Sequence, residues 1–201
     1  AKELAAEIAA AAERYGLSLT LGGGEATLLD MTTAYASLAN LGRRVRPNAI
    51  LKITDSSGKV LYDLEQDSAA LAPEKAADPR AAYIITEMLS DNAARAPSFD
   101  AGNPLNLGFK AAAKTGTTND KKDAWFAGFS PNQVAVVWVG YDDNTPHGLT
   151  GTSGAVPIWG QFMVGSQKLS KDAAASLDFA WPDGVESKTL EQAELDKYPG
   201  I

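Results

Sequence analysis

Four consecutive residues, Lys114-Thr115-Gly116-Thr117, combine an ammonium group, two hydroxyls and a glycine in a segment typical of a β-strand. Side chains alternate along a strand, so Thr115 and Thr117 are expected on one face, and Gly116 leaves the other face bare. An extended peptide could pair with such an edge as an added strand, its terminal carboxylate accepting hydrogen bonds from both hydroxyls. Lys114 lies off the threonine face, and its long stem would reach around the strand end to supply positive potential. The pattern predicts a site for the carboxylate end of a peptide.

The simpler alternative is a surface lysine at the start of a sheet strand, because three such common residues also occur together by chance. Other candidate sites are weaker. The single histidine, His147, could serve a Ser-His-Asp triad, but residues 146–148 are typical of an exposed loop. Residues 142–144 lack the spacing and the later Glu of a calcium loop, and the glycines at 22–24 lack the Lys-Ser or Lys-Thr pair of a phosphate loop. We expect no metal and no cofactor.

Composition excludes several classes of protein. The 201 residues are 45% hydrophobic and 21% charged, which is typical of a soluble globular protein. A formal charge of −7 repels phosphate backbones, so we expect no nucleic-acid partner. The chain has no cysteine, hence no thiolate site, and no apolar run of the roughly 18 residues that a membrane span requires. It opens in a helical pattern without the basic region of a signal peptide, so we expect a piece of a longer protein.

The first half of the chain alternates helical and hairpin patterns. A helix is predicted from Lys2 to Tyr15, with Leu4, Ile8 and Ala11 or Ala12 as its apolar stripe, and a second, mostly buried helix follows the N-cap Thr27 and stops at Gly42. These helices form a segment over residues 1–48. A β-hairpin is expected over 49–63. Asp78 and Pro79 begin a third helix, over 78–95, and 96–107 is predicted to be a loop.

The second half carries the predicted sheet. Strands are expected at residues 109–117, 124–129 and 133–141, and their short connections imply antiparallel neighbours. A closing helix over 155–169 and an irregular tail over 170–201 complete the chain. Helices, then an antiparallel meander over 109–141, then a helix make an α+β arrangement in which helices pack on an antiparallel sheet.

Three segments resemble one known family. K-T-G occurs with S-x-x-K and S-D-N in penicillin-binding proteins and β-lactamases. Residues 113–141, AKTGTTNDKKDAWFAGFSPNQVAVVWVGY, resemble the core of a class A penicillin-binding protein transpeptidase domain. Residues 21–47, LGGGEATLLDMTTAYASLANLGRRVRP, and 149–163, LTGTSGAVPIWGQFM, are similar to two further segments of that domain. The three segments stand in the family's order and cover most of the chain, which is far more specific than K-T-G alone.

The resemblance implies a penicillin-binding, serine β-lactamase-like transpeptidase fold, incomplete in this chain. By the family's pattern, Lys114 belongs to the hydrogen-bonded network around the nucleophilic serine and is the expected catalytic residue. Thr115, Gly116 and Thr117 are the expected substrate-binding residues, with both hydroxyls holding the carboxylate of a D-Ala-D-Ala stem peptide or a β-lactam. The Thr117 N–H would form one arm of an oxyanion hole, worth roughly 3 to 4 kcal/mol. Residues 123–126 read as a packed strand without a catalytic role.

The chain departs from the family in its serine motifs. Ser56 to Lys59 matches S-x-x-K and Ser90 to Asn92 matches S-D-N, but the first falls in a polar hairpin turn and the second at a helix end close to Lys114. The family's nucleophile opens a buried helix, where its lysine can take the serine proton. We therefore interpret both matches as coincidental. The nucleophile and the rest of the domain, including its N-terminal part, are expected upstream of this chain.

The resemblance implies part of a D-alanyl-D-alanine transpeptidase, which cross-links peptidoglycan stem peptides through a serine acyl-enzyme and also binds penicillin. Such domains face the periplasm or the cell exterior and reach the membrane only through an N-terminal anchor, which this sequence does not contain. Two alternatives remain open at this point. The chain could be a non-catalytic peptide-binding module, or it could belong to a D,D-carboxypeptidase or β-lactamase on the same scaffold.

Overall fold

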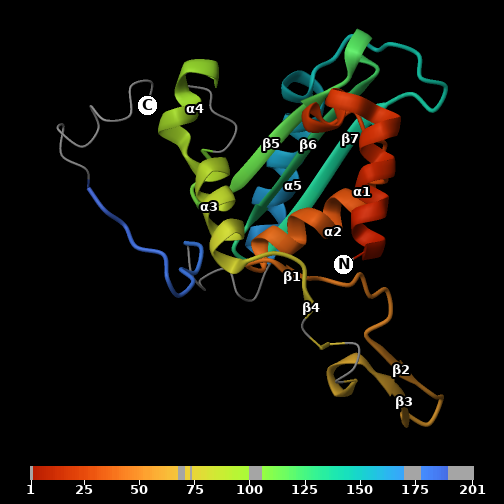
Figure 1. Ribbon diagram of the computed structural model, residues 1–201. Coiled ribbons are helices and arrows are strands. Elements are labelled where there is room, and N and C mark those ends of the chain that lie inside the picture. Colours follow the sequence, from red (N-terminus) through yellow and green to blue (C-terminus); the bar gives the residue numbers. More distant parts are fainter. Residues whose placement is uncertain (1, 68–70, 73, 100–105, 170–177, 190–201) are drawn as a thin grey trace.

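A three-stranded antiparallel sheet organises the chain, and the computed structural model describes it together with its surroundings at residues 2–67, 71–72, 74–99, 106–169 and 178–189 (Figure 1). The strands are β5 (Ala112–Thr117), β6 (Asp123–Ser130) and β7 (Gln133–Gly140), in the order β5-β6-β7. The predicted meander is thus present, but its first strand begins at Ala112 rather than at 109. Lys110 lies just before the ladder, and its Nζ pairs with Glu87 and Asp178 at 2.7 and 2.8 Å.

One face of the sheet is covered by α5 (Val156–Leu169), which lies behind the strands in Figure 1. Trp159 and Met163 of this helix are fully buried against Phe126 and Ala113. The ring of Trp159 lies 4.8 Å from that of Phe126, and its Nε1–H donates to the Ala135 carbonyl at 3.0 Å. The large buried area of the Trp159 ring and the hydrogen bond of its indole N–H together hold α5 against the sheet.

The opposite face is covered by α2 (Leu28–Ala39) and α3 (Pro79–Ser90). Phe129 of β6 is fully buried here, with Tyr35 of α2 and Phe179 packed edge-on against it. The predicted Thr27 cap is present, since its hydroxyl accepts from the Asp30 N–H at 3.1 Å. The expectation that this helix is mostly buried was wrong. None of its residues is fully buried, because only one side of the helix meets the sheet.

The third predicted helix is divided in two. α3 ends at Ser90, and α4 (Asn92–Phe99) begins at once, so residues 96–99, predicted as loop, are helical. Asp91 causes the break. Its backbone is extended, and its carboxylate accepts the N–H groups of Ala93 and Ala94 at 2.9 and 3.0 Å, which caps a new helix.

The closing helix begins at Val156, one residue after its predicted start, but a further helical turn that was not predicted comes before it. A five-residue π-helix, η5 (Gly151–Ala155), precedes α5 and runs next to β5 and β6. A capping box begins it: the Thr150 N–H donates to the Ser153 hydroxyl, and the Ser153 N–H donates to the Thr150 hydroxyl. Gly151 of this turn contacts the K-T-G strand, because its N–H donates to the Thr117 hydroxyl.

The remaining elements lie around this core. A helix, α1 (Lys2–Tyr15), occupies the predicted position and leads into η1 (Gly16–Leu21), although the side chains of Leu4, Ile8 and Ala11 lie outside the described residues. The predicted hairpin forms from β2 (Lys52–Thr54) and β3 (Val60–Asp63), and it projects away from the sheet in Figure 1. The sequence analysis missed a short ladder between β1 (Arg43–Arg44) and β4 (Glu74–Lys75).

The described part of the predicted tail, residues 178–189, has no helix or strand but packs on α3. Phe179 is buried, and the Trp181 ring lies 5.2 Å from that of Tyr83. The predictions for 170–177 and 190–201 fall outside the described residues. Within the described part of the chain, none of the helices combines the length and apolar character needed to cross a bilayer.

We predict that Gly128→Ala destabilises the fold by about 1 to 3 kcal/mol through overpacking. An added Cβ would lie 2.6 Å from the Trp159 ring and 2.7 Å from the Ala113 Cβ. Urea denaturation measures the loss. The matched control is Gly165→Ala in α5, where no atom lies within 4 Å and the helix should gain up to about 1 kcal/mol. Equal midpoints for the two variants would contradict this packing.

We also predict an acid-sensitive attachment of residues 178–181. The hydrogen bond from Lys110 lowers the pKa of Asp178, so its contribution is complete above the unfolded pKa near 4 and is lost as pH falls through the lower folded value. Trp181 fluorescence, taken as the difference from Trp181→Phe, should change as pH falls below about 4. Asp178→Asn removes the titrating group. If this variant shows the same acid transition as the unaltered chain, the attachment does not depend on Asp178.

Candidate functional site

The backbone groups of β5 divide into those facing β6 and those facing outward. At the end of the hairpin, the Thr118 N–H donates to the Asp123 carbonyl at 3.1 Å. Antiparallel pairing alternates, so Gly116 and Lys114 also bond to β6, while the N–H and C=O groups of Ala113, Thr115 and Thr117 point away from it. In the described residues β5 has no neighbour on that side, and K-T-G-T therefore lies on an open sheet edge.

The side chains of this strand follow the predicted alternation. Thr115 and Thr117 lie on the α5 face, since their register partners are Phe126, which packs on α5, and Ala124. Lys114 and Gly116 lie on the α2 face, opposite Ala127 and Trp125. Gly116 is kept small from this side, because an added Cβ would lie 3.1 Å from the Trp125 Cβ.

Lys114 bends back to the open edge. Its side chain is exposed, and its Nζ donates to the carbonyl of Thr115 at 2.9 Å. That carbonyl is one of the outward-facing groups, so the ammonium group lies at the edge beside the two threonines even though the lysine starts from the other face. The four residues singled out from the sequence are thus brought together around one stretch of edge.

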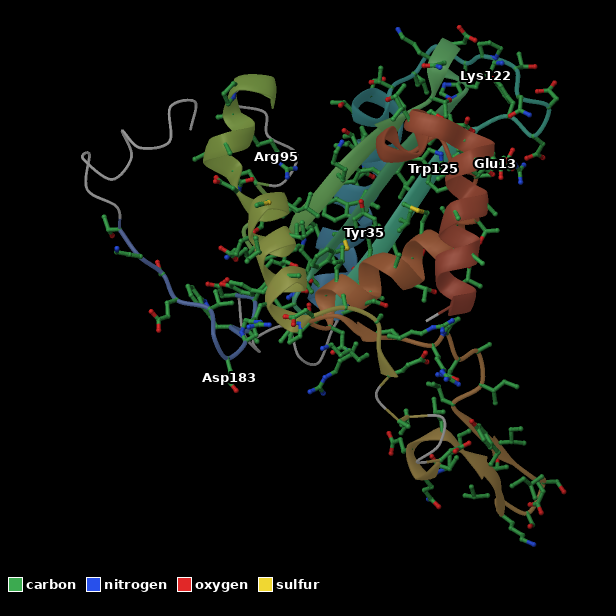
Figure 2. All side chains as sticks on the ribbon, viewed as in Figure 1. Glu13, Tyr35, Arg95, Lys122, Trp125 and Asp183 are labelled. Carbon is green, nitrogen blue, oxygen red and sulfur yellow. The ribbon has the colours of Figure 1, made fainter. Side chains whose placement is uncertain are left out.

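The edge is closed at one end by Arg95, which the sequence analysis did not identify. This arginine of α4 donates from Nη2 to the carbonyls of Leu89 and Ala113, the latter at 3.1 Å (labelled beside β5 in Figure 2). Burial lowers the pKa of Arg95, and the charge of Asp91 partly opposes this. No local pattern around residue 95 signals a contact across 18 positions of sequence. Toward the turn, the Thr115 N–H and the Thr117 N–H donate to none of the described residues, and the Thr117 carbonyl accepts from none of them.

The backbone that comes closest to Gly116 belongs to the chain itself. Gly151 of η5 lies against β5 and β6, where a Cβ on it would be 2.5 Å from the Trp125 carbonyl oxygen and 2.7 Å from that of Gly116. Its N–H donates to the Thr117 hydroxyl at 3.0 Å. This approach is over the α5 face, so the edge itself stays open. In the sequence, Gly151 belongs to one of the segments that resemble the family, but no pattern there predicts this contact.

Asp123 stabilises the turn that ends β5. It accepts hydrogen bonds from the Trp138 indole at 2.8 Å and from the Thr118 hydroxyl at 2.9 Å. Both carboxylate oxygens therefore have structural hydrogen-bond partners, as expected for a packed strand. The ring centre of Trp125 (labelled in Figure 2) lies 6.4 Å from that of Trp138.

The other sequence candidates lie elsewhere. Ser56 is in the exposed β2–β3 turn, where Asp55 accepts from Ser57 and Lys59. Ser90 is buried at the end of α3, and its hydroxyl donates to the Glu87 carbonyl at 3.2 Å. His147 is half-buried rather than exposed, with Nδ1 accepting from the Leu149 N–H at 3.0 Å. None of the three is hydrogen-bonded to Lys114 in the described part of the chain.

Two hollows of the surface lie apart from K-T-G-T. One of about 280 Å³ is enclosed by the end of α2, by Tyr83 and by residues 178–180. Another, of about 480 Å³, lies beside Glu87 and Lys110. Neither is lined by residues 114–117, which form one wall of an open surface. Outward N–H groups, two hydroxyls and an ammonium group lie around this open edge.

Comparison with known proteins identifies the family of the chain. Residues 5–163 match the family model described as the penicillin binding protein transpeptidase domain. Penicillin-binding protein 1A of Neisseria lactamica is 37% identical over 171 residues, which are 84% of this chain and 21% of that protein. The chain therefore spans about a fifth of the length of this curated relative.

Solved structures show the same fold. The penicillin-binding protein PonA1 of Mycobacterium tuberculosis superposes with a TM-score of 0.66 at 25% identity, over 87% of this chain and 47% of that one. PonA1 in complex with penicillin V gives 0.57 at 28% identity, over 70% and 38%. The chain belongs to the penicillin-binding protein transpeptidase family and forms part of such a transpeptidase domain.

Proposed function

We propose that the chain is the C-terminal portion of one D-alanyl-D-alanine transpeptidase domain, in which the preceding part of the domain supplies the nucleophilic serine. The observation that carries the proposal is the open edge of β5. Outward N–H groups of Thr115 and Thr117 lie there together with two hydroxyls and the Lys114 ammonium. An extended peptide with a terminal carboxylate matches each of these groups by hydrogen bonding or charge.

The proposed reaction is acyl transfer. The serine hydroxyl attacks the carbonyl of the penultimate D-Ala of a stem peptide. The proton of the serine passes to the nitrogen of the terminal D-Ala, which then leaves. An amine of a neighbouring stem peptide then attacks the acyl-enzyme and releases the serine, which forms the cross-link. A β-lactam acylates the same serine, in keeping with the penicillin V complex of PonA1.

Each residue of the edge has a proposed role. The Thr117 N–H faces outward and donates to the oxyanion of the tetrahedral intermediate. The Thr115 and Thr117 hydroxyls hold the terminal carboxylate. Gly116, between them, has no side chain that could obstruct the ligand. Lys114 places its ammonium group at the same edge, where it joins the hydrogen-bonded network of the serine. Its bond to the Thr115 carbonyl supports this placement.

The two serine motifs within the chain do not fit the nucleophile's role. A nucleophile needs a base within hydrogen-bond reach and a site that excludes water. Ser56 lies in an exposed turn, and the Ser90 hydroxyl is bonded to a main-chain carbonyl of its own helix. This supports a serine from outside the chain.

The preceding part of the domain is the proposed main partner. A strand edge is one wall, and acyl transfer needs a second wall that excludes water. Ile158 and Phe162 of α5 are 51% and 56% exposed, and Met88 of α3 is 66% exposed. Ile158 and Phe162 lie one turn apart on α5, and exposed apolar side chains that are neighbours on one helix support packing of further protein there. By analogy with its relatives, we place the parent protein at the periplasmic or outer face of the cytoplasmic membrane.

A fluorescent penicillin tests the location of the nucleophile. We expect the chain alone to stay unlabelled and the complete domain containing it to be labelled at a serine outside residues 1–201. Lys114→Ala should slow labelling about 100-fold or more, as loss of a charged hydrogen-bond donor beside the reacting groups does. Ser56→Ala, Ser90→Ala and the matched Lys59→Ala should label like the unaltered domain.

Mass spectrometry of the labelled peptide distinguishes the outcomes. Labelling at Ser56 or Ser90 would show that the chain carries its own nucleophile. A complete domain that takes no label at all would refute the transpeptidase proposal. Release of the label by water rather than by an added amine would favour the carboxypeptidase or β-lactamase alternative.

Recognition of the carboxylate has its own test. In the complete domain, Thr117→Val should weaken binding of a D-Ala-D-Ala peptide about 10- to 100-fold, the value of a hydrogen bond to a charged group. Isothermal titration calorimetry measures this loss. The control is Thr54→Val on the distant hairpin, which should bind normally. Binding that survives Thr117→Val unchanged would place the peptide on another surface.

A further inference from the structure

The hydroxyl of Thr117 is the one threonine hydroxyl of the K-T-G-T edge that the described part of the chain holds in place. It accepts a hydrogen bond from the Gly151 N–H at 3.0 Å. A hydroxyl has one hydrogen to donate and two lone pairs to accept with. Because Gly151 occupies one lone pair, the Thr117 hydrogen is restricted to the two remaining positions around the oxygen. The Thr115 hydroxyl has no such partner among the described residues.

Gly151 can make this bond only because it lacks a side chain. It is buried, and a Cβ on it would stand 2.5 Å from the Trp125 carbonyl oxygen and 2.7 Å from the Gly116 carbonyl oxygen. Both distances are far inside van der Waals contact, and the atoms are main-chain atoms of the sheet, which cannot rotate away. Any other residue would therefore push η5 off β5 and lengthen the bond to Thr117.

The turn that carries Gly151 is itself fixed. The reciprocal hydrogen bonds between Thr150 and Ser153, at 2.9 and 3.2 Å, hold the start of the π-helix. A π-helix is uncommon, and such turns often occur at functional sites. Here the turn lets the amide of Gly151 point at β5 while the chain continues into α5.

We propose that Gly151 is a positioning residue, whose N–H orients the Thr117 hydroxyl toward the carboxylate of the ligand. The inference rests on the proposed function and adds a specificity determinant outside K-T-G-T. With one of its two lone pairs occupied, the hydroxyl has fewer orientations open to it and donates its hydrogen to a carboxylate oxygen at a lower ordering cost. A ligand with a C-terminal amide still offers one acceptor but gains less, because its acceptor is uncharged.

The test compares affinities of the complete domain for a D-Ala-D-Ala peptide and for the same peptide with a C-terminal amide. Gly151→Ala should lower the acid-to-amide affinity ratio about tenfold, the size of one charge-assisted hydrogen bond. The matched control is Gly154→Ala in the same turn, where the nearest atom would lie 3.3 Å from the new Cβ. This variant should keep the ratio. A general loss of structure would lower both affinities and leave the ratio unchanged.

A double variant separates positioning from other effects. If Gly151 acts through Thr117, Gly151→Ala combined with Thr117→Val should have the same ratio as Thr117→Val alone. Additive losses, or an unchanged ratio in Gly151→Ala, would overturn the inference while leaving the proposed function intact. Failure of the unaltered domain to bind either peptide would overturn the proposed function and the inference with it.

A second measurement tests the inference without the Gly151→Ala variant, so it can be made even if that variant does not fold. In Thr117→Val the Gly151 N–H loses its acceptor, so its hydrogen exchange, followed by NMR, should accelerate about tenfold or more. Thr117→Ser keeps the hydroxyl and should restore the protection. Equal protection of Gly151 in the unaltered and Thr117→Val proteins would show that the bond does not exist in solution.

Discussion

The alternation of hydrogen bonds between β5 and β6 decides which groups the K-T-G strand presents. Because Thr118 bonds to Asp123, the N–H groups of Thr115 and Thr117 face outward. A slip of one residue would reverse this, turning these groups into the ladder and moving both hydroxyls to the α2 face. The turn is therefore as important to the edge as K-T-G itself. Asp123 secures it by bonding the Thr118 hydroxyl and the Trp138 indole.

Two layers of helices give the strand its rigidity from opposite sides. Trp159 packs over Gly128 on one face of β6, and Tyr35 packs against Phe129 on the other. Because β6 is buried on both faces, it is held in place. β5 takes its position from β6. Arg95 then ties the end of α3 to the same strand through the Leu89 and Ala113 carbonyls. A ligand that pairs with the edge thus meets a preformed surface, which lowers the ordering cost of binding.

Local patterns were sufficient for the parts of the fold that depend on neighbours in sequence. Thr27 and Asp78 are caps as predicted, and the short turns of residues 118–122 and 131–132 imply the antiparallel meander. Side-chain alternation also gave the faces of Thr115 and Thr117 correctly. The break at Asp91 was missed because the apolar pattern continues across it, and only the extended backbone of that one residue separates α3 from α4.

The features that the sequence could not supply are contacts between distant segments. Arg95 and Gly151 reach β5 across 18 and 34 positions, and neither residue type signals a partner. Gly151 is the more instructive case. A glycine before a helix ordinarily indicates a loose turn, but here the missing Cβ allows one main chain to press against another. Gly116 leaves room for Trp125 on the α2 face, and Gly151, from another element, leaves room for the main chain of the sheet on the α5 face. The missing Cβ of Gly151 lets η5 reach the Thr117 hydroxyl over the α5 face, so the position of this hydroxyl depends on the packing of the layer behind the strand.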